Sequence, residues 1–117
     1  MYYVLLNSNG IEVKETSEMP SYEQMADWVG IPGEQVHKHI DVVYGNYSDP
    51  AIVMIVDDES PVRDDYQPTC MSTGGDVLLG QVLIFHHDVV NQDFCLLSVE
   101  QLQIVKQETR LYCRVSR

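Results

Sequence analysis

A continuous apolar segment, Ala51 to Val56 (AIVMIV), constrains the fold more strongly than any other part of the chain. The segment has the length of a β-strand and is rich in β-branched residues, and none of its positions is polar. Because a strand with this pattern is covered on both faces, we predict that residues 51–56 form the central strand of a sheet. No apolar run approaches the roughly 20 residues that a membrane-spanning helix requires.

Turn residues and alternating patterns place the other strands. Residues 2–6 are β-rich and are followed by Asn9-Gly10, which provides the two positive-φ positions of a tight hairpin turn, so residues 11–15 are expected to return as the second strand. Further strands, one of which carries Gly80 as a bulge or a close backbone approach, are expected at 35–44, 76–85 and 94–97. The end of the chain, 111–115, either adds an edge strand or stays loose.

Two helices are predicted from capping boxes, in which a serine hydroxyl and a glutamine side chain satisfy backbone N–H groups at a helix start. Ser21 and Gln24 begin a helix over 21–29, and Ser98 and Gln101 begin a second helix with an apolar stripe. The chain is therefore expected to form one α+β domain over residues 1–117. Its core would be a mostly antiparallel sheet of five to six strands with two short helices packed on it.

The charge of the chain is strongly acidic and unevenly distributed. Seven Lys and Arg stand against 18 Asp and Glu, which gives a formal net charge of −11. This balance excludes the usual nucleic-acid-binding proteins, which need a basic surface, and disfavours docking on an anionic membrane. An acidic loop is expected at about 57–75, where paired carboxylates would be solvated and unsuited to acid–base catalysis. The C-terminal segment 106–117 is basic and either folds back on the acidic body or meets a partner.

The cysteine content favours a reducing compartment. Cys70, Cys95 and Cys113 cannot all pair within one chain, and they show no CxxC spacing. Because the N-terminal residues lack the pattern of an export signal, we predict a cytoplasmic protein. Cys95 is expected to act as a small hydrophobe in a strand, and Cys70 to be a loop thiol without a cationic neighbour.

The histidines raise the question of a metal site. His37 and His39 lie two residues apart on a predicted strand and would share one face, whereas the adjacent His86 and His87 would face opposite ways. No HExxH or paired CxxC motif supports a zinc site, and no nucleophile or phosphate-binding motif is found. We therefore predict no metal, no cofactor and no enzymatic activity. A small metalloprotein or nucleotide-handling protein built on the histidines remains an alternative.

Several segments in order resemble a known family. They are Trp28-Val29-Gly30, the strand around Ile40, the apolar strand ending in Asp57-Asp58-Glu59, the segment from Gly75 to Ile84 (GDVLLGQVLI), and Phe94 to Ser98 (FCLLS). This order is similar to domain of unknown function family 3846, small acidic proteins typical of phages and conjugative elements. The resemblance covers most of residues 1–108, and the Asp64-Asp65 loop and the basic tail depart from it. It implies a mobile-element origin and a location in the host cell, and it transfers no catalytic residue.

Charge and resemblance together predict a non-enzymatic inhibitor of a host defence nuclease, of the CRISPR or restriction type. It would block a basic nucleic-acid-binding surface. Carboxylates two residues apart on a β-strand lie about 6.6 Å apart on one face. Such rows of carboxylates approach the charge density of duplex DNA, which carries one charge per about 3.4 Å on each DNA strand. The acids expected on the binding face are Glu34, Asp41, Asp57, Asp58, Glu59, Asp64 and Asp65, and the aromatic anchors are Trp28, Tyr44, Tyr47 and Tyr66.

A second hypothesis needs no nuclease. The chain could be an accessory interaction module of a mobile element that pairs as a homodimer through an exposed sheet edge. Salt distinguishes the two hypotheses, because binding steered by charge weakens with ionic strength and an apolar edge contact does not.

Overall fold

The computed structural model describes residues 1–7, 10–29, 40–57, 68–71 and 77–111. Its main sheet has the strand order β2-β1-β7-β4-β3, with β8 also pairing with β7, and a smaller sheet has the order β6-β5-β9; all pairings are antiparallel. The elements are β1 (Tyr2–Asn7), β2 (Gly10–Glu15), α1 (Tyr22–Val29), β3 (Ile40–Val43), β4 (Ile52–Asp57), β5 (Pro68–Met71), β6 (Val77–Leu79), β7 (Val82–Asp88), β8 (Asp93–Cys95), α2 (Val99–Glu108) and β9 (Arg110–Leu111). The predicted α+β class is confirmed.

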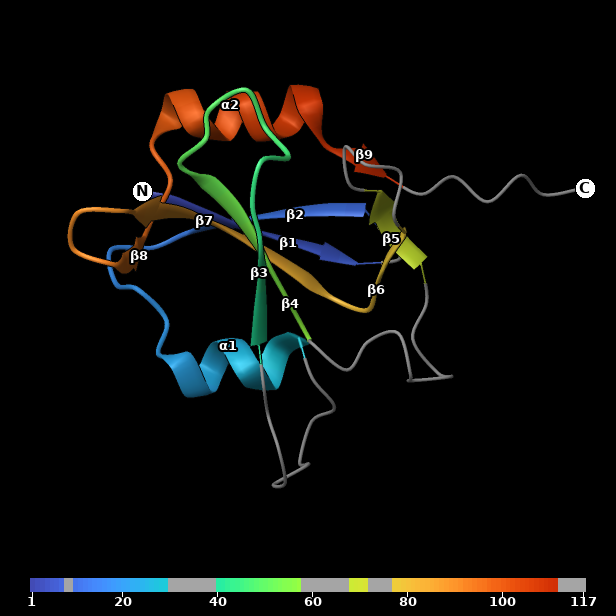
Figure 1. The fold of residues 1–117 in the computed structure, drawn as a ribbon, viewed down its shortest axis with the longest axis horizontal. Helices are drawn as coiled ribbons and strands as arrows, with labels where there is room; N and C mark the ends of the chain where they lie inside the picture. Colours follow the sequence, from blue (N-terminus) through green and yellow to red (C-terminus); the bar gives the residue numbers. More distant parts are fainter. Residues whose placement is uncertain (8–9, 30–39, 58–67, 72–76, 112–117) are drawn as a thin grey trace, which may run out of the picture.

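The two helices cover opposite faces of the main sheet, as Figure 1 shows. Successive side chains of a strand point to opposite faces, so each inner strand supplies both layers of the core. On the face of α2, the buried residues include Val4, Leu6, Ile52, Met54, Val82, Ile84, Leu102 and Val105. On the face of α1, they are Met25, Val29, Ile55, Leu83, Phe85 and Leu96.

The apolar run forms a strand that is buried along its whole length, as predicted. Every residue of β4 is buried, from Ile52 to Asp57. The strand in the middle of the order is nevertheless β7, and β4 lies between β7 and β3. The single strand predicted over 76–85 is wrong, because the backbone turns at Gly80 (φ 78°) and places β6 and β7 in different sheets.

The first hairpin has the predicted strands but a different turn. Asn7 pairs with Gly10, so the two connecting residues are Ser8 and Asn9, which lie outside the described residues. Gly10 belongs to β2 and has φ 119°, a conformation that glycine adopts without strain. Gly10 is therefore a strand residue, which corrects its predicted place in the turn.

Both capping boxes are confirmed. At α1, the backbone N–H of Gln24 donates to the Ser21 hydroxyl (3.1 Å) and Ser21 N–H donates to Gln24 Oε1 (2.9 Å). At α2, the same reciprocal pair joins Ser98 and Gln101 at 3.2 and 3.1 Å. Two donors without an intrahelical partner are thus satisfied at each helix start.

Two described parts of the loop predicted at about 57–75, Asp57 and residues 68–71, belong to strands instead. Asp57 is the last residue of β4 and is 3% exposed, and residues 68–71 form β5. Cys70 is therefore a buried strand residue and not a loop thiol, and burial raises its pKa to about 11. The remaining loop residues and the predicted strand residues 35–39 and 112–115 lie outside the described part of the chain.

The last connections of the main sheet are short. The strand predicted at 94–97 is observed as β8 at 93–95, followed by a bridge between Leu97 and Tyr2. No helix in the described ranges is long and apolar enough to cross a membrane.

Candidate functional site

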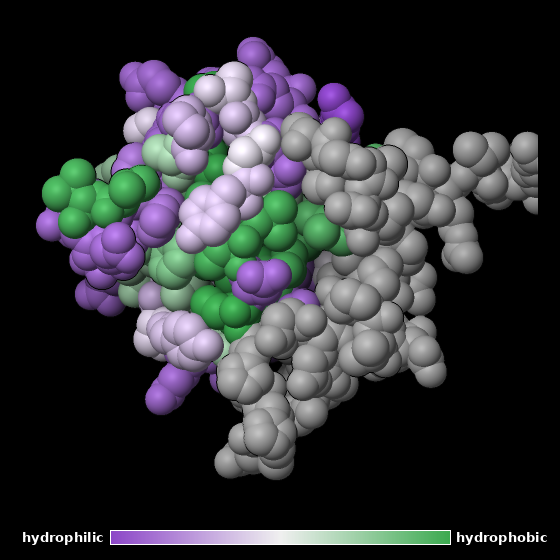
Figure 2. All heavy atoms as spheres, in the orientation of Figure 1, coloured by the Kyte–Doolittle hydropathy of each residue, from purple (hydrophilic) through white to green (hydrophobic). Residues whose placement is uncertain are grey.

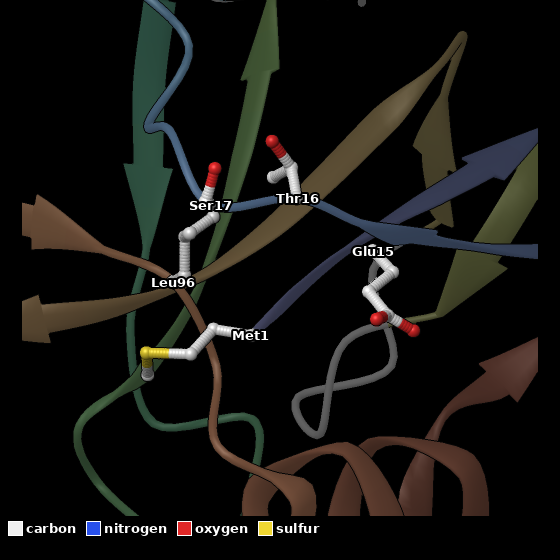
Figure 3. Close-up of a pocket in the computed structure, with 5 residues that line it drawn as sticks. All are labelled: Met1, Glu15, Thr16, Ser17 and Leu96. Carbon is white, nitrogen blue, oxygen red and sulfur yellow. The ribbon is translucent and has the colours of Figure 1, made fainter.

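Two neighbouring cavities open where β1 begins, between the end of β2 and the start of α2. The smaller one has a volume of about 470 Å³ and is lined by Met1, Glu15, Thr16, Ser17 and Leu96. The larger one, about 530 Å³, is lined by Met1, Leu96 and seven residues of the β3–β4 connection, β7, β8 and α2. Because Met1 and Leu96 line both cavities, we treat them as one groove. Figure 3 shows the smaller part, in which the Met1 thioether and the Glu15 carboxylate point to opposite sides of the view.

Backbone hydrogen bonds hold the groove from both sides of Met1. The N–H of Thr16 donates to the Met1 carbonyl at 3.0 Å. Tyr2 and Leu97 exchange two backbone bonds, from Tyr2 N–H at 3.0 Å and from Leu97 N–H at 2.6 Å. The start of β1 is therefore fixed between β2 and the segment that leads into α2, and the shape of the groove does not depend on mobile side chains alone.

Carboxylates border both parts of the groove. Glu15 lines the smaller cavity, and Asp49 and Glu100 line the larger one. Asp49 is held in place, since its Oδ1 accepts the N–H of Ala51 at 2.9 Å and its Oδ2 accepts from Gln101 at 3.1 Å. The described lining residues of the two cavities include no lysine or arginine. The groove thus combines an apolar floor with negative sides.

A buried amide connects three elements at the larger cavity. Gln101 Nε2 donates to Asp49 Oδ2 and lies 2.8 Å from His86 Nδ1. Its orientation is fixed by two neighbours, because the N–H of Ser98 can only donate to Oε1 and a carboxylate can only accept from Nε2. His86 Nδ1 must therefore be the acceptor, and in the neutral ring Nε2 carries the proton.

This tautomer limits what His86 can do chemically. Cys95 is its cross-strand partner and lines the same cavity. A cysteine nucleophile needs a neighbouring base to take its proton, and a metal ligand needs a free nitrogen. Because Nδ1 already accepts a hydrogen bond and Nε2 is protonated, His86 acts neither as a base for Cys95 nor as a metal ligand. It offers a hydrogen-bond donor. The arrangement is suited to binding an acceptor group.

One predicted aromatic anchor is wrong. Tyr47 is 7% exposed, and its hydroxyl makes a 2.7 Å hydrogen bond with Thr109 Oγ1. Burial raises the pKa of this hydroxyl well above its usual range. Beside it, the Glu108 carboxylate accepts from the N–H (2.8 Å) and the hydroxyl of Ser48, and these bonds lower the pKa of Glu108. Tyr47 therefore ties the β3–β4 connection to the end of α2 and offers no surface to a partner.

The other predicted contact residues are dispersed. Trp28 is half-buried and stacks on Tyr3, with ring centroids 5.7 Å apart. Tyr44 is 57% exposed and meets the edge of the His87 ring. Asp41 is exposed on β3, whereas Asp57 is buried, which corrects its expected place on a solvated face. The remaining predicted contacts, Glu34, Asp58, Glu59, Asp64, Asp65 and Tyr66, lie outside the described residues.

The described surface is nonetheless acidic. A Lys14–Glu12 ion pair has an N···O distance of 3.6 Å. Exposed basic side chains in the described ranges are Lys14, Lys106 and Arg110. Exposed acidic side chains there are Glu12, Glu15, Glu18, Glu23, Asp27, Asp41, Asp93 and Glu100. In the sequence, isolated acids look like ordinary surface residues until the fold brings them together, which is why the groove acids Glu15, Asp49 and Glu100 are not among the predicted contacts.

The surface also has an apolar area. Figure 2 shows hydrophobic side chains between the two helices, where Figure 1 places β3. β3 ends the strand order of the main sheet, and its Val42 and Val43 are half-buried. Asp41 Oδ1 accepts the backbone N–H of Val42 at 2.9 Å, so this backbone donor of β3 is already hydrogen-bonded to a carboxylate.

No group of three His, Cys, Asp or Glu side chains in the described ranges is placed to hold a metal ion. His37 and His39 lie outside those ranges. Cys70 and Cys95 are free thiols.

Comparisons with known proteins add no relative: no family model, curated protein or solved structure matches the chain. The resemblance to family 3846 therefore stays a prediction.

Proposed function

We propose that the protein is a non-enzymatic, acidic protein of a mobile genetic element that covers the basic nucleic-acid-binding surface of a host defence nuclease in the host cytoplasm. The observation that carries this proposal is the excess of exposed carboxylates over exposed cations on the described surface, together with a formal net charge of −11. A surface of one sign steers a partner of the opposite sign and orients it before contact.

One stretch of this surface, from β2 to α1, supports a role other than folding. It carries five exposed carboxylates. Two of them, Glu23 and Asp27, stand four residues apart on α1, and the last turn of the helix has no basic residue. Like charges at this spacing destabilise a helix by about 0.2–0.5 kcal/mol. The exposed acids of this stretch follow one another along the chain, so their negative charges act together on an approaching cationic partner. The acids of this β2–α1 stretch are Glu12, Glu15, Glu18, Glu23 and Asp27.

Two parts of the proposal, the nuclease as partner and the mobile-element origin, have a basis other than the surface charge. They rest on the resemblance of the sequence to family 3846 and on the chemistry of the expected partner. Nucleases that bind duplexes or heteroduplexes do so through strongly basic channels, which an acidic protein can occupy.

The test is capture from bacterial lysate on the immobilised protein, followed by elution with duplex DNA. We expect a nucleic-acid-binding enzyme that DNA displaces and that loses nuclease activity when the protein is added. A variant with the five β2–α1 acids changed to Gln or Asn should capture less of the enzyme. A captured protein that DNA does not displace, or one that remains fully active in the complex, would contradict the proposal.

The apolar area at β3 favours a second candidate, a module that pairs with another copy through this strand. Such a dimer would resist salt, whereas a charge-steered complex would not. Sedimentation of the purified protein at low and high salt distinguishes them: a dimer that persists at high salt supports the second candidate, and a monomer at both supports the first.

A further inference from the structure

The groove between β1, β2 and the start of α2 has the composition of a site for long cationic side chains. Its floor is made by Met1 and Leu96, which are shared by the two cavities. Its sides carry Glu15 at one part and Asp49 and Glu100 at the other. Lys and Arg side chains combine an apolar stem with a charged head, so a stem on the floor would place the head beside a carboxylate.

We propose that this groove binds arginine or lysine side chains of an extended basic peptide segment in the partner. The inference rests on the proposed function and narrows it, because it assigns the contact to one place on the acidic surface. Each cavity falls within the roughly 300–1,000 Å³ of small-ligand pockets. Two such side chains, one in each part of the groove, would belong to the same segment.

Charge complementarity selects this occupant over others. An anion would be repelled by three carboxylates, and a purely apolar ligand would remove the Glu15 and Glu100 carboxylates from water without giving them a partner. Among the described lining residues the α-ammonium of Met1 is the one fixed cation, and three carboxylates outnumber it, so the groove keeps a net negative charge. His86 adds an N–H donor to the larger cavity, which suits a carbonyl of the bound peptide backbone.

Arginine fits the groove better than lysine does. Its planar fork donates two parallel hydrogen bonds to a carboxylate, and its guanidinium is more weakly hydrated than the ammonium of lysine. Glu15 and Glu100 are exposed, so they can adjust to such a fork, whereas Asp49 already accepts at both oxygens. We therefore expect Glu15 and Glu100 to make the principal ion pairs.

The experiment is an NMR titration of the full chain with a blocked tetrapeptide that has leucine and arginine at alternate positions. The control peptide replaces each arginine by citrulline, which has nearly the same shape and no charge. The test variant is Glu15→Gln with Glu100→Gln. The matched control is Asp41→Asn with Asp93→Asn, which removes the same charge from exposed positions outside the β2–α1 stretch and outside the lining of the two cavities.

We expect the arginine peptide to shift resonances of Met1, Leu96 and their neighbours. Because the test variant loses two partly exposed ion pairs, it should bind the arginine peptide about tenfold more weakly than the wild type. The control variant should change the affinity by less than about twofold. Equal losses in both variants, equal binding of the citrulline peptide, or shifts confined to other surfaces would overturn the inference.

Failure of the groove proposal and failure of the proposed function give different experimental results. A nuclease that is captured and inhibited equally by the wild type and the Glu15/Glu100 variant would leave the proposed function standing and remove the groove from it. Specific peptide binding without any nucleic-acid-binding partner would do the reverse.

Discussion

Gln101 Nε2 lies 2.8 Å from Nδ1 of His86, and this contact joins the first turn of α2 to the central strand β7. Because the Gln101 side chain also accepts from Ser98 N–H and donates to Asp49, one amide serves as a helix cap and as a tertiary link. The same geometry fixes the tautomer of His86 at the edge of the groove. The stability of the fold and the shape of the site are therefore coupled at a single residue.

The first prediction concerns this buried amide. Gln101→Ala removes the acceptor of the Ser98 N–H in the capping box of α2 and takes the amide donor away from Asp49 and His86, so the free energy of unfolding should fall by about 2–3 kcal/mol. The matched control is Gln24→Ala, which disrupts the exposed capping box of α1 and should lower it by less than about 1 kcal/mol. Urea denaturation measures both, and equal losses would show that the tertiary link contributes nothing.

Alkaline pH provides a second test, at Tyr47. Its raised pKa means that the folded protein keeps the phenol proton that an unfolded chain loses near pH 10. The stabilisation is fully present below that pH and is lost as the pH rises, at roughly 1.4 kcal/mol per pH unit. Tyr47→Phe cannot ionise, so its stability should fall less steeply above about pH 10. Parallel curves for the two proteins would contradict the assignment.

A third prediction concerns Cys70, whose ionisation should reduce the stability of the fold at a pH below the range in which Tyr47 ionises. Its pKa of about 11 exceeds that of an unfolded thiol, about 8.5, so unfolding releases a proton between these values. Stability should therefore begin to fall above about pH 8.5 in the wild type and remain flatter there in Cys70→Ala. Because the substitution also leaves a cavity, the slope with pH is compared and not the absolute stability.

The edge of β3 is the subject of a fourth prediction. Asp41→Val removes the carboxylate that accepts the N–H of Val42, and it adds an apolar side chain to β3 next in sequence to the half-buried Val42 and Val43. Exposed strand edges without charge pair with other chains, so this variant should self-associate in sedimentation experiments. Asp41→Asn keeps an acceptor oxygen and separates the effect of the hydrogen bond from that of the charge. A monomeric Asp41→Val at high concentration would contradict the prediction.

A fifth prediction uses Trp28, the single tryptophan of the chain. Its ring stacks on Tyr3, which stacks in turn on Phe85. Trp28→Ala removes a half-buried aromatic contact and should lower the free energy of unfolding by about 1–3 kcal/mol. Trp28→Phe should recover most of this loss. If both variants are as stable as the wild type, the stack does not hold α1 on the sheet.

Local signals in the sequence predicted the elements well. The apolar run predicted as a strand over 51–56 is observed as the buried strand β4 from Ile52, because consecutive apolar side chains need cover on both faces. The capping boxes at Ser21 and Ser98 mark both helix starts, since each depends on two side chains three residues apart. Signals of this kind depend on near neighbours and are independent of the rest of the fold.

Features that depend on distant parts of the chain were not predictable in the same way. The pattern over 76–85 is continuous in apolar character, and the turn at Gly80 became visible only when β6 and β7 were found in different sheets. Tyr47 resembles an exposed loop aromatic until Thr109 is placed against it. The groove likewise needs Glu15, Asp49 and Glu100 from three separated segments, and the sequence gives no signal that links them.

The most direct test of the proposed charge-steered binding is the dissociation constant of the captured partner, measured at several salt concentrations for the wild type and for the variant with the five β2–α1 acids neutralised. We expect wild-type affinity to fall steeply between about 0.05 and 0.5 M salt, and we expect the variant to bind more weakly with a shallower dependence on salt. An affinity that is independent of salt and unchanged in the variant would contradict it, and the acidic surface would then serve only to keep the protein in solution.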